Sequence, residues 1–174
     1  MTEQRRGRRQ SYAMQRITAG ARSYRARAVA AGAYLPGLAR RPRPDVLLVC
    51  CSDPRLHPGL ITGSLPGQML ELRTPGASVE PAGTPVLTRA LAFPSLRDIV
   101  VMGHSDCEAA DPDPRQAAED GRGLVARQLA ALAGHPAVEA RLAARQLRLH
   151  GWYHDLATGT TTRYQPGTGT FTTL

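Results

Sequence analysis

Residues 45–55, DVLLVCCSDPR, join an apolar run to a cluster of reactive side chains, and they decide the expected fold. The run DVLLVC (45–50) is rich in β-branched residues and suits a strand buried on both faces. DIVVMG (98–103) has the same character, and MLEL (69–72) is a third candidate strand. Because 85–93 reads as a helix between the last two, this order predicts an α/β domain whose central, mainly parallel sheet is flanked by helices.

The second half of the chain adds helices and then an appended edge. Residues 121–133 carry apolar side chains on one helical stripe, and Pro136 opens a shorter helix. From 147 to 174 the sequence alternates and contains Thr-Gly and Pro-Gly turns, which predicts a strand followed by a hairpin. The acidic, Pro-rich stretch 111–120 is read as a surface loop, with gating of a nearby site as the alternative.

The N-terminal part is expected to form a helical arm. Residues 11–33 favour a helix that ends at Pro36 and Gly37. Its apolar face is thin, as is typical of a helix that packs on a partner chain. The sequence therefore divides into an Arg-rich tail and arm, residues 1–36, and an α/β domain, residues 37–174. The apolar residues of the arm are Tyr12, Ile17, Tyr24 and Val29.

The composition argues against several classes of protein, among them nucleic-acid-binding, membrane-spanning and disulfide-bonded proteins. The chain has 174 residues, 42% of them hydrophobic, enough for a sizeable core. Its net charge of +8 comes from Arg alone, but no RNP, zinc-knuckle or recognition-helix signature accompanies it, so nucleic-acid binding is not expected. No apolar run approaches the roughly 20 residues of a membrane span, and no apolar segment follows the charged first ten residues, so a cytoplasmic location is expected. Three Cys favour metal binding or a reactive thiol over a disulfide framework.

The ends of two predicted strands carry the candidate site. Cys51, Asp53 and Arg55 follow the first strand, and His104 and Cys107 follow the strand at 98–103. Ligands of open α/β sheets bind beyond the carboxyl ends of the strands. Two thiolates and one imidazole suit Zn²⁺ and leave a fourth position open. Asp53 is expected either to fill that position or to hydrogen-bond a bound water, with Arg55 forking onto its carboxylate.

The neighbouring candidates receive structural interpretations. Cys50 is expected in the core, because adjacent side chains of a strand point to opposite faces. The remaining histidines are expected to be structural or exposed, and His57 is the one nearest the candidate site. They are His57, His135, His150 and His154.

These motifs carry a family resemblance. The C-S-D-x-R pattern at 51–55 and the G-H-S-x-C pattern at 103–107 follow buried strands some fifty residues apart. Together with residues 61–77 and LHGWYHDLATG at 149–159, they resemble the β-carbonic anhydrases. The resemblance extends from about residue 42 to residue 164.

The resemblance implies both a fold and an activity. It implies one zinc per chain, held by Cys51, His104 and Cys107, with Asp53 and Arg55 as a catalytic dyad. In that family a zinc-bound hydroxide attacks carbon dioxide and gives bicarbonate, a lyase reaction. The family unit is a homodimer or higher oligomer, and its N-terminal helices commonly clasp the neighbouring subunit.

Several pocket positions depart from the family pattern. Pro54 replaces a Ser, Glu108 replaces a Gly, Pro42 stands where a Gln is frequent, and residues 73–77 read RTPGA instead of RNAGN. Three interpretations follow: a carbonic anhydrase with a variant pocket, a hydrolase of carbonyl sulfide or carbon disulfide, or an inactive zinc protein that acts as a scaffold. Because two thiolates cancel the formal charge of zinc, any hydration activity is expected to rise toward alkaline pH.

Overall fold

The computed structural model describes residues 3–40, 42–79, 84–108 and 114–174, with side chains from 12–40, 42–79, 85–108 and 121–174. The chain divides into two compact units, Met1–Arg41 and Pro42–Leu174. The boundary expected from the sequence lies after residue 36. Across the described ranges, no helix is both long enough and apolar enough to cross a membrane.

The first unit consists of two helices, α1 (Glu3–Ala30) and α2 (Leu35–Leu38). The expected arm helix is present and begins earlier than predicted, since residues 3–10 include the helix formers Arg and Gln. Pro36 lies in the first turn of α2, where a missing N–H costs nothing, so it opens a short helix rather than ending the arm. The large apolar side chains of α1 are exposed, namely Tyr12, Met14, Ile17, Tyr24 and Val29.

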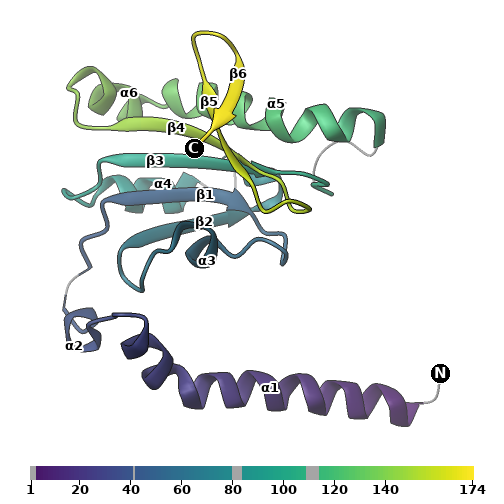
Figure 1. Cartoon of the computed structure of the whole chain (residues 1–174). Helices are drawn as coiled ribbons and strands as arrows, with labels where there is room; N and C mark the ends of the chain where they lie inside the picture. Colours follow the sequence, from purple (N-terminus) through teal and green to yellow (C-terminus); the bar gives the residue numbers. More distant parts are fainter. Residues whose placement is uncertain (1–2, 41, 80–83, 109–113) are drawn as a thin grey trace. The chain divides into compact units, whose positions relative to one another are not determined.

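The second unit is built on one six-stranded sheet with the order β2-β1-β3-β4-β5-β6 (Figure 1). The first four strands in this order are parallel, and the last two pairings are antiparallel. The mainly parallel sheet and the C-terminal hairpin are therefore confirmed. The strands are β1 (Val46–Cys51), β2 (Met69–Thr74), β3 (Asp98–His104), β4 (Arg148–His154), β5 (Thr161–Gln165) and β6 (Thr170–Thr173).

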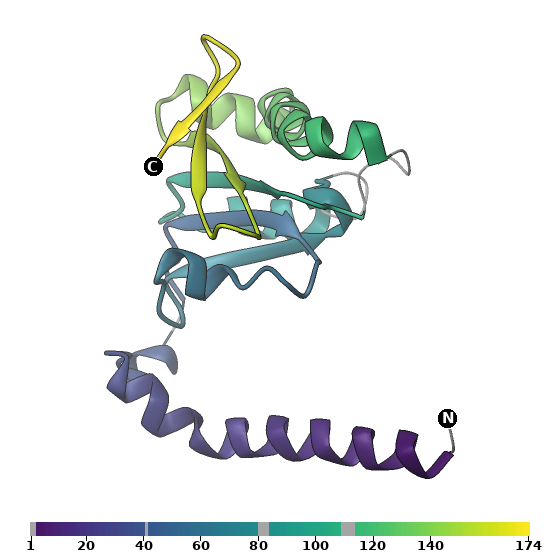
Figure 2. The same cartoon turned by 45° about the vertical axis from the view of Figure 1, so that its right-hand side comes forward.

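Helices α4, α5 and α6 pack on one face of this sheet, and the short helix α3 lies on the other (Figure 2). Leu47 and Ile99 of the strands pack on one face with side chains of α4, α5 and α6. Leu48 and Met102 point to the other face and pack with Leu56, just before α3. This alternation is what a strand buried on both sides requires. The helices of this unit are α3 (Pro58–Thr62), the 3₁₀ turn η1 (Pro75–Ala77), α4 (Thr84–Leu91), α5 (Pro114–Ala133) and α6 (Pro136–Ala143).

One prediction for this unit is wrong. Residues 114–120, expected in a surface loop, form the first turns of α5, while residues 111–113 lie outside the described part of the chain. The reason is local: Pro114 occupies the first helical position, and the RQAAE that follows consists of good helix formers. The short helix α3 was not expected.

Helix α5 approaches the end of β3 so closely that only glycine fits at the contact. A Cβ built on Gly121 would lie 2.5 Å from the His104 carbonyl oxygen, and one built on Gly103 would lie 2.5 Å from the Gly121 carbonyl oxygen. Both obstructing atoms belong to the backbone, so neither can rotate away. This contact fixes α5 directly against the residue that ends β3.

We expect Gly121→Ala to lower the free energy of unfolding by about 1–3 kcal/mol, because the new methyl group forces α5 away from β3. Gly123→Ala on the same helix is the matched control, since its Cβ would meet only the flexible end of Arg127, at 3.1 Å. Removing a helical glycine there should raise stability by up to about 1 kcal/mol. Urea unfolding of both variants checks this, and equal effects at both positions would contradict the close contact.

Candidate metal centre and active site

Two neighbouring strands bring the candidate ligands to one edge of the sheet. Cys51 is the last residue of β1, and His104 is the last residue of β3. The two strands are parallel neighbours, with Cys50 paired to Met102, so their carboxyl ends lie side by side. Cys107 follows in the turn after β3, where Asp106 has a φ of 51°. The topology therefore places residues 51 and 104–107 together.

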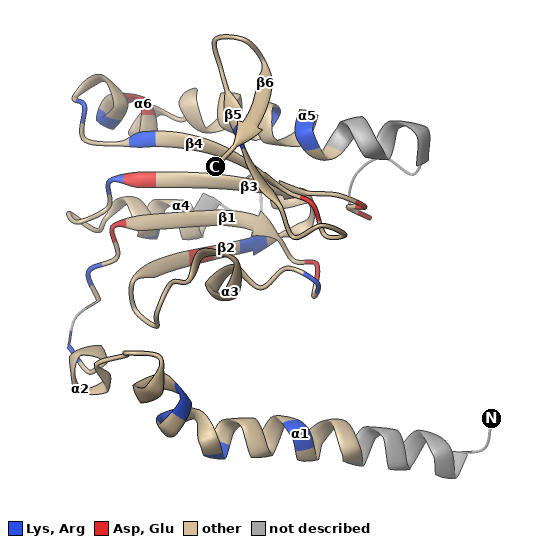
Figure 3. Ribbon diagram, in the orientation of Figure 1, with Lys and Arg blue, Asp and Glu red and all other residues tan. Residues whose placement is uncertain are grey.

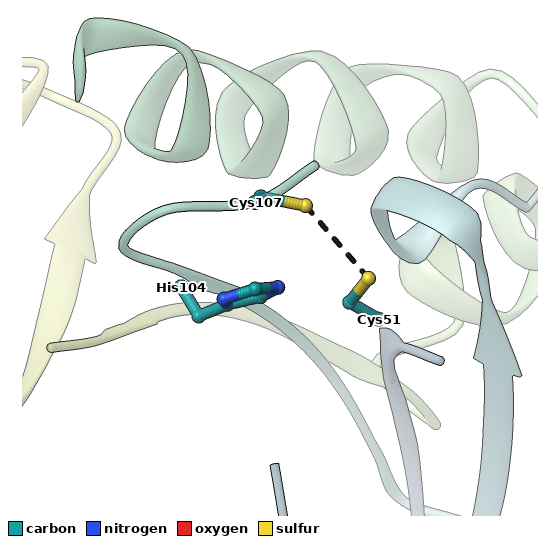
Figure 4. Close-up of side chains that lie close together, drawn as sticks. All are labelled: Cys51, His104 and Cys107. Atoms are coloured by element: carbon teal, nitrogen blue, oxygen red, sulfur yellow. Dashed lines mark hydrogen bonds between the residues drawn. The ribbon is translucent and has the colours of Figure 1, made fainter. Parts of the chain in front are cut away.

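The three predicted ligands converge on one point (Figure 4). The Sγ atoms of Cys51 and Cys107 are 3.7 Å apart. These sulfurs and a ring nitrogen of His104 all lie within 4.8 Å of one another, and the three side chains are buried. Among the residues that the structure describes, this is the one group of Cys, His, Asp and Glu with metal-site spacing.

His104 presents an unprotonated nitrogen to this point. Its Nδ1 lies 2.7 Å from the carbonyl oxygen of Ser105, which can only accept, so Nδ1 carries the proton. Its Nε2 is buried and has no hydrogen-bond partner among the described residues. Burial lowers the pKa of His104, which keeps the imidazole neutral. A buried acceptor left without a donor is costly, and a metal ion would satisfy it.

The donor set fits zinc. Sulfurs at about 2.3 Å from a tetrahedral zinc are about 3.8 Å apart, close to the 3.7 Å between Cys51 and Cys107. A disulfide, in contrast, requires about 2.05 Å. Two thiolates with one imidazole are ligands that zinc prefers, and a set of three leaves one coordination position for another group.

The Asp53 carboxylate lies beside these ligand atoms and is fully engaged by Arg55. Arg55 Nε donates to Oδ1 at 3.0 Å, Nη2 donates to Oδ2 at 2.7 Å, and the Arg55 backbone N–H donates to Oδ1 at 2.8 Å. These bonds hold the pKa of Asp53 at about 2 instead of its ordinary 3.8, so the group is an ionised acceptor. Its Oδ2 is 3.9 Å from His104 Nε2. The expected two-pronged pair between Asp53 and Arg55 is thus present, and its carboxylate lies beside the metal-site residues.

Two further contacts tie the site loops together. Arg55 Nη2 also donates to the Asp106 carbonyl oxygen, at 2.7 Å, and so links the loop after β1 to the loop after β3. Arg73, near the end of β2, donates to the carbonyl oxygens of Asp53 (2.8 Å) and Leu56 (3.0 Å). Sequence reasoning assigned Arg73 no role. The sequence does not show that β2 pairs with β1. In the structure this pairing places Arg73 opposite Cys50, next to the loop that follows β1.

A pocket of about 690 Å³ opens beside the site. Two of the unusual residues noted in the sequence, Pro54 and Glu108, line it. The lining consists of Cys51, Ser52, Asp53, Pro54, Arg55, Pro75 and Glu108.

The neighbouring Cys and His residues have other surroundings. Cys50 is fully buried, and burial raises its pKa to about 11, so it stays a thiol in the core. His57 Nδ1 accepts a hydrogen bond from the Leu60 backbone N–H and caps α3. His150 lies 2.7 Å from Asp98, and His154 Nδ1 lies 2.9 Å from the Thr161 hydroxyl.

Comparison with known sequences identifies the family. Residues 46–124 match the family model described as carbonic anhydrase. A carbonic anhydrase of Pseudomonas aeruginosa is 33% identical over 162 residues, which cover 70% of this chain and 74% of that protein. Carbonic anhydrase 1 of Escherichia coli O157:H7 is 30% identical over 177 residues, covering 79% of this chain and 81% of the relative.

Solved structures described as β-carbonic anhydrases share this fold. The β-carbonic anhydrase CcaA superposes with a TM-score of 0.82 at 24% identity and covers 94% of this chain and 92% of its own. A tetrameric β-carbonic anhydrase of the ascomycete Sordaria macrospora gives a TM-score of 0.71 at 20% identity, with coverage of 96% and 99%. The sequence relatives and the shared fold together show that the chain belongs to the β-carbonic anhydrase family and is a carbonic anhydrase-like lyase.

Proposed function

We propose that the protein catalyses the reversible hydration of carbon dioxide to bicarbonate with one zinc ion per chain, held by Cys51, His104 and Cys107. The observation that carries the proposal is the convergence of these three donors beside an ionised Asp53. When bound there, zinc would supply a Lewis acid that lowers the pKa of a water molecule and orients it. The relatives named carbonic anhydrase support the same reaction.

The residues of the chain divide the remaining work. The His104 Nδ1–H bond to Ser105 fixes the ring orientation and leaves Nε2 as the ligand atom. Asp53, locked by Arg55, acts as an acceptor that orients the O–H of the nucleophile and directs its lone pair into the pocket. Arg55 holds the Asp53 carboxylate in this orientation, because its guanidinium donates to both carboxylate oxygens.

The rate of hydration is expected to rise from pH 7 to pH 9. Asp53, with a pKa of about 2, is ionised throughout this range, and burial keeps His104 neutral, so neither group produces the increase. Two thiolates bring negative charge to the site and disfavour deprotonation of a water held there, which moves that deprotonation toward alkaline pH. Stopped-flow hydration with a pH indicator measures this profile. A rate that is flat from pH 7 upward would contradict the charge argument.

We further propose that the working unit is a homodimer or higher oligomer in which α1 packs on a partner subunit. The arm buries few of its own apolar side chains: Tyr12 is 64% exposed and Ile17 is 63% exposed. The tetrameric Sordaria protein has the same fold. Light scattering of the full chain checks the assembly, and a mass of 18.7 kDa, that of one chain, would contradict it. The cytoplasmic location expected from the sequence stays a prediction.

A further inference from the structure

The charged side chains that line the pocket are more negative than positive. Three charged side chains line it, Asp53, Arg55 and Glu108. Asp53 and Arg55 neutralise each other in a two-pronged pair. Glu108 has no hydrogen bond or ion pair within the described part of the chain, and its carboxylate acts on Arg55 through space. The three charged side chains that line the pocket therefore sum to one negative charge, and acidic residues follow both β1 and β3 in Figure 3.

The same pocket offers few donors to an anion. Pro54 and Pro75 contribute walls without a backbone N–H. Arg55 commits its backbone N–H, Nε and Nη2 to Asp53, and Nη2 also to the Asp106 carbonyl oxygen, so this side chain offers an anion only its Nη1. Anion sites in proteins need free N–H groups or unpaired cations. A neutral molecule such as carbon dioxide does not need these groups, whereas bicarbonate does.

We propose that Glu108 is a charge-selecting residue that weakens the binding of bicarbonate and other small monovalent anions in this pocket without affecting neutral ligands. The inference rests on the proposed function and adds a specificity to it. Glu108 directly follows Cys107 in the sequence and lines the same pocket as Cys51 and Asp53. The negative charge of Glu108 disfavours an anion in the pocket and leaves an uncharged molecule unaffected.

For catalysis, the consequence is weaker binding of the product bicarbonate. Bicarbonate should have a high KM, and the protein should resist inhibition by anions. The overall equilibrium constant is fixed, so a variant that binds bicarbonate more tightly with unchanged carbon dioxide kinetics must lose dehydration kcat by the same factor. This pairing of a lower KM with a lower kcat separates charge selection from a general loss of activity.

The test is calorimetric titration of zinc-loaded protein with azide as the anionic probe and imidazole at pH 8.5 as the neutral one, at constant ionic strength. In Glu108→Gln, azide is expected to bind roughly two- to five-fold more tightly, the effect of one charge in a solvated site. The bicarbonate KM should fall by a similar factor, and imidazole binding should not change. Glu108→Asp keeps the charge and should behave like the unmodified protein, as should Glu139→Gln on α6.

Each remaining outcome has one meaning. Unchanged azide affinity in Glu108→Gln would overturn the proposal, and so would an equal gain for azide and imidazole, since the latter indicates pocket shape instead of charge. Failure of the proposed function is seen separately. An unmodified protein that holds zinc and does not hydrate carbon dioxide would refute that function, while the azide titration would still decide the role of Glu108.

Discussion

Replacing Cys51 by Ala is expected to remove zinc from the protein and abolish carbon dioxide hydration, whereas replacing the adjacent Cys50 by Ala should leave both intact. Cys51 Sγ lies 3.7 Å from Cys107 Sγ in the three-residue group, while Cys50 is a fully buried thiol with a pKa of about 11. Residues that only support a metal ligand already cost 10–100-fold in metal affinity when they are replaced. Loss of a ligand itself should therefore exceed roughly 100-fold.

Zinc content by atomic emission and the hydration rate are measured on the same samples. Substitution with Co²⁺ adds an independent reading, because cobalt–thiolate bonds absorb in the near ultraviolet and that absorption should weaken in Cys51→Ala. The two variants remove the same atom from neighbouring positions, so a difference between them reports on the site and not on loss of a thiol. Full zinc occupancy in Cys51→Ala, or loss of zinc in Cys50→Ala, would show that the ligand assignment is wrong.

The second large effect is expected at Asp53. Asp53→Asn should lower kcat/KM for hydration by roughly 10²–10³ while zinc stays bound, because an amide oriented by Arg55 cannot replace an ionised acceptor. The pKa of about 2 shows that the carboxylate is ionised at every assay pH. Asp53 lies beside the Cys and His ligand group and its oxygens bind Arg55, so zinc retention is expected.

The chain supplies a matched control at the opposite end of the sheet. Asp98, which begins β3, accepts from Arg148 Nε and Nη2 at 2.7 Å each, a pairing of the same kind as that between Asp53 and Arg55. Asp98→Asn breaks this second pair far from the pocket and should leave hydration unchanged. If both variants lose activity equally, the cause is loop or fold stability. If Asp53→Asn keeps full activity, the dyad has no catalytic role.

Much of this site follows from the strand pattern of the sequence. The two apolar runs that end directly before Cys51 and His104 could be recognised as buried strands, and parallel strands that are neighbours bring their carboxyl ends together. The short spacing between His104 and Cys107 then completes the group. The local fork between Asp53 and Arg55 could also be predicted, because residues two apart in a turn can pair.

Other features depend on packing that the pattern does not reveal. In the sequence, the start of α5 at Pro114 resembles a loop because Asp and Pro dominate residues 111–114, although the stretch that follows favours a helix. The role of Arg73 depends on the pairing of β2 with β1, and the contact between Gly103 and Gly121 depends on how closely α5 approaches the sheet. Such contacts join distant parts of the chain, and local preference carries no information about them.

The most direct test of the central claim is carbon dioxide hydration by one preparation before and after removal of its metal. The protein is purified with its zinc content measured, stripped with a chelator, and then given one equivalent of Zn²⁺, with stopped-flow rates taken at pH 8.5 at each stage. We predict hydration that disappears on stripping and returns at one zinc per chain. A fully zinc-loaded protein without hydration would contradict the proposed function, and carbonyl sulfide and carbon disulfide would be the next substrates to assay.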